Sequence, residues 1–334
     1  LDNNHEYVLE LSCKTKQDKP FTPAGFEINF QQFVLNEKIN NLSEEKDLSK
    51  NSEIKIEEKD NLCTVKIGSI KYEFNKKTGA INLLNKDKLL ISSMNSNLWR
   101  APISNEKSDW GKAEEKDWYN MGLNEYQTNV EKFEIDKINS TIKIKSYTTF
   151  SRSSDLVIND FTYIFNNDGS VKISHTMIPL GYFNVSWLPC IGLKFMMPDS
   201  FQNLSWYGRG PYENYPDRKT GAKLGIHKVK IDSVMNPYIE PQEYGNYCDV
   251  RWFEINNNKE GIKIISDNSI NISAVPYYNL DRAEYIYQLM RDGYNRIQIN
   301  YGINGVGDTP NPTMPKYRVY PREYKNNLII KVKD

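Results

Sequence analysis

Residues 65–84 read VKIGSIKYEFNKKTGAINLL and hold three short segments in which apolar and polar side chains alternate. Successive side chains of a strand point to opposite faces of a sheet, so this alternation predicts strands with one buried face. Lys76-Lys77-Thr78-Gly79 separates the second segment from the third, and its glycine favours a tight turn. The stretch therefore predicts consecutive short strands joined by turns.

The same alternation recurs along most of the chain. It is found in residues 141–144, 156–165, 171–178, 185–195, 262–265, 270–273, 297–299 and 328–332. Many short strands indicate a sandwich rather than a sheet built from βαβ units. Residues 280–290, with Asn279 as a cap, have the one helical pattern. The sequence predicts an all-β fold, a large antiparallel β-sandwich.

The first 53 residues differ from the rest. Residues 6–11 and 26–35 are apolar-rich and predict two strands around a turn at residues 20–25, and a polar, charged stretch follows. We therefore divide the chain into residues 1–37, which close a preceding domain, a linker at 38–53, and the sandwich at 54–334. Because the chain opens at Leu1 with neither an initiator Met nor a signal-like apolar run, we expect it to be a segment of a longer protein.

Charge and cysteine usage argue against several classes of protein. Lys plus Arg and Asp plus Glu both number 43, and no basic run is present, which disfavours a nucleic-acid partner. No stretch approaches the roughly 20 apolar residues that span a bilayer. The cysteines Cys13, Cys63, Cys190 and Cys248 are far apart and accompanied by only three histidines, so we predict four separate thiols and no metal site.

Two features favour contact with a ligand. The 22 Tyr and 6 Trp suit strands, and they also suit sugars, whose apolar C–H faces stack on aromatic rings. Residues 105–116 are strongly charged, lack strand alternation and contain Gly111. A loop of this length in a compact β domain is typically functional or mobile.

Glycoside hydrolysis requires two carboxylates, one on each side of the scissile bond. The candidates are Glu213 and Asp217 in GRGPYENYPDR (208–218), and Glu240 and Glu243 in PYIEPQEYG (237–245). Both segments are loop-like, and carboxylates in such loops more often accept backbone N–H and arginine hydrogen bonds, as Asp217 could from Arg218. The residues alone therefore favour a structural role for these groups.

Three strings resemble the last domain of the large β-galactosidases of glycoside hydrolase family 2: LWRAP (98–102), GRGPYENYPDR (208–218) and PQEYGNYCDVRW (241–252). The turn at 74–79 and the ending at 305–308 and 315–318 fit the same pattern, and residues 23–27 and 31–33 resemble the closing strands of the immunoglobulin-like domain before it. The motif residues are Trp99, Arg100, Glu213, Asn214, Asp217, Arg218, Glu243, Arg251 and Trp252.

The resemblance implies a sandwich of the galactose-mutarotase-like type in a glycosidase that hydrolyses terminal β-D-galactosides. It places the catalytic glutamates in a TIM barrel upstream, so we expect no catalytic residue in this chain and no activity of the chain alone. The implied partners are the upstream barrel and sandwich domains and a β-galactoside or oligosaccharide substrate, and the full-length protein can be a homo-oligomer. No cofactor is expected within the chain, although full-length members often use Mg or Na elsewhere.

The resemblance also places a mobile loop beside the active site, directly after the LWRAP string. The corresponding residues are Asn105, Glu106, Ser108, Asp109 and Trp110. Ser104-Asn105-Glu106 stands where the family has Asp-Asn-Asp, and Phe26 stands in place of a histidine. Residues 305–312 lack the Trp that stacks on the sugar in the family, and Trp110 is the best candidate to replace it, the alternative being an ordinary loop anchor packed on the sandwich.

The sequence is also compatible with two other functions. A carbohydrate-binding module without hydrolytic activity would be expected to have a complete sheet of its own, which the strands in residues 6–35 do not suggest. An aldose-epimerase-like enzyme would rely on a histidine near its operating pH. His175 and His227 both lie in strand-like segments rather than in loop motifs, which favours a structural or surface role for each.

Overall fold

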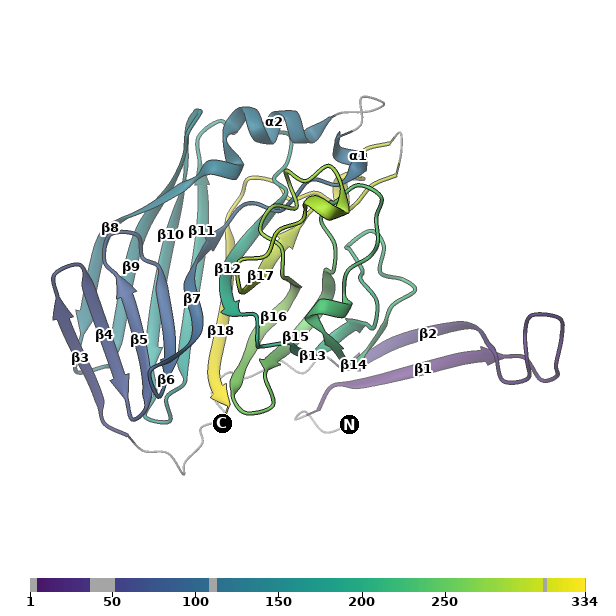
Figure 1. Cartoon of the computed structure of the whole chain (residues 1–334), viewed down its shortest axis with the longest axis horizontal. Helices are drawn as coiled ribbons and strands as arrows, with labels where there is room; N and C mark the ends of the chain where they lie inside the picture. The colour runs from purple at the N-terminus through teal and green to yellow at the C-terminus, as the bar shows by residue number, and fades with distance from the viewer. Residues whose placement is uncertain (1–4, 37–51, 108–112, 309–310, 334) are drawn as a thin grey trace. The chain divides into compact units, whose positions relative to one another are not determined.

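The structure, a computed structural model, describes residues 5–36, 52–107, 113–308 and 311–333 (Figure 1). The chain divides into two compact units, Leu1–Asn41 and Leu42–Asp334. All strand pairs recorded for the described residues are antiparallel. No helix in these ranges is long and apolar enough to cross a membrane.

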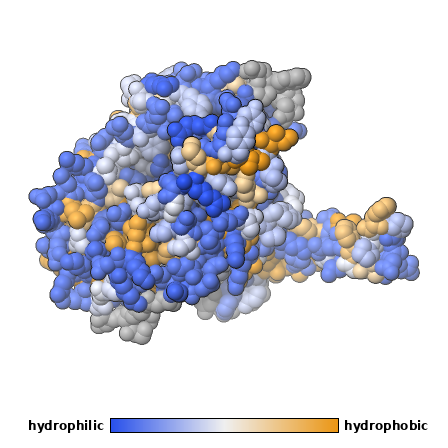
Figure 2. All heavy atoms as spheres, viewed as in Figure 1, coloured by the Kyte–Doolittle hydropathy of each residue, from blue (hydrophilic) through white to orange (hydrophobic). Residues whose placement is uncertain are grey.

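The first unit is a hairpin of β1 (Tyr7–Lys14) and β2 (Glu27–Asn36). Large apolar side chains along it are exposed, and some appear as orange spheres in Figure 2. They are Leu9, Leu11, Phe21, Phe26, Ile28, Phe33, Val34 and Leu35. An isolated two-stranded hairpin is at best marginally stable in water. The hairpin therefore leaves most of its large apolar side chains uncovered.

The second unit is built on a 16-stranded sheet. Its main path runs through β3 (Ile54–Lys59), β4 (Leu62–Ile67), β5 (Ile70–Asn75), β6 (Ile81–Asn85), β7 (Lys88–Asn97), β12 (Cys190–Pro198), β17 (Tyr294–Ile303), β16 (Gly261–Val275), β18 (Tyr324–Lys333), β11 (Val171–Leu180), β10 (Ser153–Phe165), β9 (Thr141–Phe150) and β8 (Gln127–Asp136). A branch consists of β15 (Tyr247–Asn256), which pairs with β16, then β13 (Asn203–Gly210) and β14 (Lys223–Lys230).

The sheet folds over so that its two ends pack face to face. Phe74 of β5 contacts Tyr163 of β10 with ring centroids 5.1 Å apart, and the hydroxyl of Tyr72 donates a 2.8 Å hydrogen bond to the carbonyl of Gly169. The alternating apolar side chains of both layers form one large core. The expected all-β antiparallel sandwich is confirmed.

Two expectations about helices are wrong. Residues 280–290 contain only the 3-10 turn η3 (Ile286–Gln288), because the Asn279 side chain bonds the carbonyl of Gln288 and the N–H of Met290 and closes a loop. Short helices instead occur at the two ends of the expected loop, as α1 (Ser104–Lys107) and α2 (Glu114–Met121). The remaining 3-10 turns are η1 (Leu123–Glu125), η2 (Ile231–Ser233) and η4 (Pro315–Tyr317).

Trp118 explains why α2 forms beside the sheet. Its indole is buried and donates a 2.8 Å hydrogen bond to the carbonyl of Trp187. Glu114, Trp118 and Met121 are the buried residues of the helix, at the four- and three-residue spacing of one helical face. These three buried side chains anchor an otherwise polar, charged stretch to the protein. Their spacing is helical, so strand alternation does not reveal it.

His175 of β11 is enclosed in the second unit. Its ring stacks on Phe161 at 3.8 Å, and its Nδ1 lies 2.9 Å from the hydroxyl of Tyr301. Burial lowers the pKa of His175 from 6.5 to about 3. The folded protein therefore holds this imidazole neutral.

Replacing His175 with Gln is expected to reduce the acid sensitivity of folding. The unfolded chain binds a proton at His175 below pH 6.5, whereas the folded chain does so only near pH 3, so stability is lost as the pH falls through this window. Between pH 7 and pH 5 the histidine should account for a loss of about 2 kcal/mol in the free energy of unfolding. Urea unfolding at both pH values would measure it, with His227→Gln as the control. Equal pH dependence of wild type and His175→Gln would contradict a neutral, buried imidazole.

Candidate functional site

Four segments that are far apart in sequence meet around one cavity of about 300 Å³. They are residues 98–107, 211–218, 238–246 and 304–307, which we call the loop cluster. The cavity is lined by Ile103, Ser104, Asn105, Tyr215, Arg218, Tyr238, Gln242, Glu243, Val306 and Gly307. The strings singled out in the sequence thus supply most of one site.

A buried ion pair joins the segment after β7 to α1. The guanidinium of Arg100 donates to both carboxylate oxygens of Glu106, at 2.8 and 2.6 Å. The Glu106 carboxylate also accepts hydrogen bonds from the N–H of Ile103 at 3.0 Å and from Asn304 at 3.3 Å. Burial acts to lower the pKa of Arg100, but the adjacent Glu106 carboxylate raises it above its ordinary value. Glu106 therefore lies inside the protein and fixes the backbone around α1.

Glu243 lies beside this ion pair and is only 4% exposed. Burial is the main cause that raises its pKa to about 8. Arg100 opposes the shift, while Glu213 and Glu106 add to it. Its Oε1 has no hydrogen-bond partner among the described residues, and neither has the Nε of Arg100. Burial thus favours the protonated form of this carboxyl group.

Glu213 connects two of the loops. Its carboxylate accepts hydrogen bonds from Arg218 at 2.6 Å, from the backbone N–H of Gly245 at 2.8 Å and from the hydroxyl of Tyr238. Asn214, which is buried, accepts from the N–H of Cys248 at 2.9 Å. These bonds hold residues 211–218 against residues 238–248.

The sequence suggested an ion pair between Asp217 and Arg218, but Arg218 instead binds the carboxylate of Glu213. The two carboxylate oxygens of Asp217 accept the N–H groups of Val306 and Gly307, at 2.9 and 2.8 Å. A Cβ at Gly305 would lie 2.5 Å from the Asp217 carboxylate, so only glycine fits this approach.

Asn105 reaches the same C-terminal loop. Its Nδ2 donates a 2.9 Å hydrogen bond to the carbonyl of Val306. Of the five expected loop residues, Asn105 and Glu106 are thus placed in the cluster. Ser108, Asp109 and Trp110 lie outside the described residues.

Other sequence candidates lie elsewhere. Arg251 and Trp252 belong to β15: Arg251 stacks on Tyr207, and Trp252 lines a separate cavity on the β13–β15 branch. Trp99 packs against Tyr119 with ring centroids 5.2 Å apart. Tyr238, Gln242 and Asn304 were not singled out from the sequence, because isolated polar residues in loops carry no periodic signal.

The cluster is chemically better suited to holding loops than to acid–base work. The carboxylates of Glu106, Glu213 and Asp217 are all occupied by donors of the chain itself, and Glu243 is buried. Among the described residues, no group of three or more His, Cys, Asp or Glu side chains could hold a metal ion. The hydrogen bonds to Glu106, Glu213 and Asp217 hold the backbone of the four segments at fixed positions around the cavity.

Comparison with known proteins identifies the chain's relatives. It is 30% identical to a β-galactosidase of Priestia megaterium, in an alignment that covers 98% of this chain and 31% of that protein. It is 27% identical to a β-galactosidase of Pseudoalteromonas haloplanktis, again over 98% of this chain and 32% of that protein. The chain therefore spans about a third of the length of the curated relatives it matches.

Among solved structures, an aldose epimerase homologue from C. elegans covers 84% of this chain and 99% of its own, with a TM-score of 0.45 and 9% identity. Residues 66–330 match the family described as beta galactosidase small chain. Because this match extends over most of the sequence and includes the loop cluster, the chain belongs to the β-galactosidase small-chain family.

Proposed function

We propose that this chain is the C-terminal accessory part of a β-galactosidase that hydrolyses terminal β-D-galactosides. The loop cluster shapes the rim of an active site whose catalytic glutamates lie outside this chain. The observation that carries the proposal is that three carboxylates bind groups of the chain itself. Glu106 accepts from Arg100, Glu213 accepts from the N–H of Gly245, and Asp217 accepts from the N–H groups of residues 306–307. Such a site positions backbone and side chains but leaves no exposed pair of carboxylates to flank a glycosidic bond.

Asn105 is the rim residue best placed to approach the substrate in this proposal. It lies in α1, between the buried Glu106 and the exposed Ser104, and Val306 fixes its side chain. We extend the rim through Ser108, Asp109 and Trp110, which lie outside the described residues. Trp110 would then supply the aromatic platform that the C-terminal loop lacks.

The hairpin has a separate role. We propose that β1 and β2 complete an immunoglobulin-like sheet upstream, within the same polypeptide. Their exposed apolar side chains support this, because such a surface is normally covered in a soluble protein. The linker at 38–53 then separates that domain from the sandwich at 54–334.

An aldose-epimerase activity is disfavoured by the histidines. His175 is buried against Phe161 and Tyr301, and the Nε2 of His227 lies 3.1 Å from the carbonyl of Lys223 on the β13–β15 branch. Neither histidine lines the loop cluster cavity.

The test is reconstitution. The 334-residue chain alone should not hydrolyse a chromogenic β-galactoside, whereas the chain joined to the upstream two-thirds of the Priestia megaterium enzyme should, because only the joined protein contains both parts. The upstream part alone is the control. Turnover by the isolated chain that disappears in Glu213→Gln or Glu243→Gln would overturn the proposal, as would full activity of the upstream part alone.

A further inference from the structure

Exposed apolar side chains of the second unit are concentrated in residues 277–290, between β16 and β17. The exposed ones are Tyr278, Tyr285, Ile286, Tyr287 and Met290, and we call them the apolar face. Tyr287 is 82% exposed and Tyr285 is 52% exposed. Single apolar side chains on a protein surface are normal, whereas a contiguous apolar patch marks a surface that another molecule or domain covers.

The segment that carries the apolar face has a fixed conformation. The Oε1 of Gln288 accepts a hydrogen bond from the N–H of Tyr285 at 3.1 Å. The N–H of Tyr278 donates to the carbonyl of Met290 at 3.2 Å. The rings of Tyr285 and Tyr287 stack nearly parallel, with centroids 5.5 Å apart. Because the face is formed before a partner arrives, covering it costs little conformational entropy.

The inner side of the same segment packs on the loop cluster. Two of its leucines share a small core with residues from two segments of that cluster. The core contains Leu280 and Leu289 together with Ala101, Tyr238 and Tyr244. The inward apolar side chains are thus covered within the described chain, while the apolar face points outward. This shared core holds the apolar face at a fixed position beside the loop cluster.

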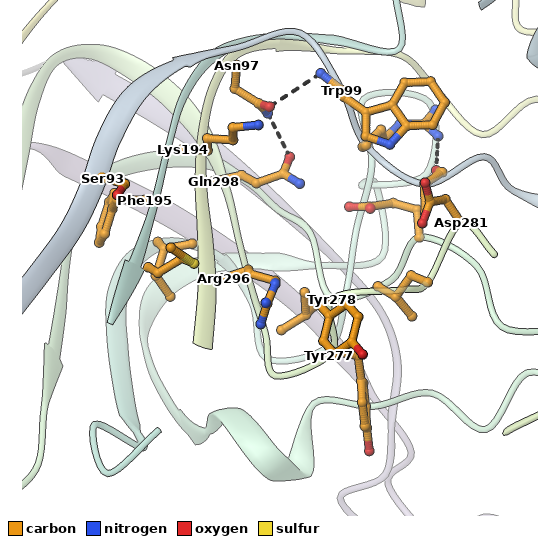
Figure 3. A pocket seen from close by; sticks show the side chains of 17 residues that line it. Ser93, Asn97, Trp99, Lys194, Phe195, Tyr277, Tyr278, Asp281, Arg296 and Gln298 are labelled. Atoms are coloured by element: carbon orange, nitrogen blue, oxygen red, sulfur yellow. Dashed lines mark hydrogen bonds between the residues drawn. The ribbon is translucent and has the colours of Figure 1, made fainter. Parts of the chain in front are cut away.

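A cavity of about 360 Å³ adjoins the apolar face (Figure 3). Tyr277 and Tyr278 line it from the segment, Trp99 lines it from the end of β7, and Gln298 lines it from β17. More than half of the residues around it are aromatic or apolar. The cavity therefore suits an apolar side chain that projects from a partner surface.

Charged groups next to the apolar face are paired within the chain. The guanidinium of Arg291 donates to Asp232 at 2.8 Å. That of Arg296 donates to both carboxylate oxygens of Asp292. Tyrosine and methionine are enriched, and charged residues are depleted, where two protein surfaces meet. The surface that covers this face is therefore expected to be apolar protein.

We propose that an apolar surface of the upstream catalytic part of the same polypeptide covers the apolar face. The inference rests on the proposed function, under which that part meets the loop cluster. The chain covers 31% of the Priestia megaterium β-galactosidase, so most of such a polypeptide lies outside it. Because the shared core fixes the apolar face beside the loop cluster, a part that meets one also meets the other.

The test is nitration of tyrosines with tetranitromethane, read by mass spectrometry. It is applied to the 334-residue chain alone and to the chain joined to the upstream part of the Priestia megaterium enzyme. Tyr287 should react at least about tenfold more slowly in the joined protein, because covering its ring excludes the reagent. Tyr182 is the matched control, since it is 95% exposed between β11 and β12 and does not line the cavity. Its rate should be the same in both proteins.

A charge placed in the apolar face should undo this protection. Met290→Asp in the joined protein should return the nitration of Tyr287 to within about threefold of its rate in the chain alone, because burying an unpaired carboxylate opposes docking. Ile138→Asp is the control, since Ile138 is 94% exposed in the turn between β8 and β9, and it should leave Tyr287 protected. Near-UV circular dichroism of each variant confirms that it is folded.

Equal nitration of Tyr287 in the joined protein and in the chain alone would overturn the inference, and so would protection that Met290→Asp leaves unchanged. Protection that appears in the chain alone as its concentration rises would also overturn it, because a second copy would then cover the face. Hydrolysis of a chromogenic β-galactoside by the joined protein is measured separately. An active joined protein with a freely nitrated Tyr287 would remove the docking surface and leave the proposed function standing. An inactive joined protein with a protected Tyr287 would remove the proposed function alone.

Discussion

Replacing Arg100 with Met is expected to lower the free energy of unfolding by about 3–5 kcal/mol, because a buried ion pair that loses one partner leaves a buried charge uncompensated. Arg100 is 1% exposed and Glu106 is 3% exposed, so water cannot take over the role of the guanidinium. The change also frees the carbonyl of Ala101, which Arg100 binds at 2.9 Å. For a domain of this size, the melting temperature should fall by about 5–8 °C.

The double variant Arg100→Met/Glu106→Gln separates the cost of the unpaired Glu106 charge from the cost of losing the other contacts of Arg100. With the carboxylate replaced by a neutral amide, most of the penalty of the unpaired charge disappears, so the double variant should be more stable than Arg100→Met alone. Arg152→Met is the matched control, since Arg152 and Glu125 are an exposed pair at 3.8 Å. Such a pair contributes at most about 1 kcal/mol.

Denaturant unfolding at pH 7 measures all four proteins. If Arg100→Met were as stable as Arg152→Met, the buried ion pair would not fix α1 within the loop cluster. A double variant less stable than Arg100→Met would mean that the Glu106 carboxylate is needed for its bonds to Ile103 and Asn304.

The sandwich could be predicted from the sequence because strand alternation is a local signal. Residues 65–84 form β4 to β6 as expected, since each apolar side chain of Val65, Ile67, Tyr72 and Phe74 is buried on one face. Residues of different motif strings also lie close together in the structure. Arg100 and Glu243, from different strings, lie beside each other.

The partners of individual side chains could not be predicted in this way. The adjacency of Asp217 and Arg218 suggested a local ion pair, but the loops bring Asp217 to residues 89 and 90 positions away. The cavity with Trp99, Gln298 and Tyr278 likewise depends on strand register and on a loop that sequence pattern predicts as a helix. Long-range register and loop closure leave no periodic trace in the sequence.

Replacing Asp217 with Ala is expected to lower the free energy of unfolding by about 2–3 kcal/mol, since two hydrogen bonds from backbone N–H groups to one carboxylate are lost. The melting temperature should fall by about 3–5 °C. Asp160→Ala, at an exposed aspartate of β10, is the control and should change the free energy of unfolding by less than about 0.5 kcal/mol.

The same variant tests what the C-terminal loop does for the assembled enzyme. Without Asp217, Val306 and Gly307 lose the anchor that fixes their backbone, and Asn105 loses a fixed acceptor at the carbonyl of Val306. Under the proposed function the loop cluster forms part of the active-site rim, where small misplacements near a reacting centre are costly. In the chain joined to an upstream catalytic part, kcat/KM for a chromogenic galactoside should then fall at least about tenfold. Asp217→Asn should fall between wild type and Asp217→Ala, since its one oxygen can accept only part of the pair. A loss of sugar binding with an unchanged melting temperature would instead mean that Asp217 contacts the ligand itself, because a carboxylate that anchors a loop cannot be removed without a change in stability.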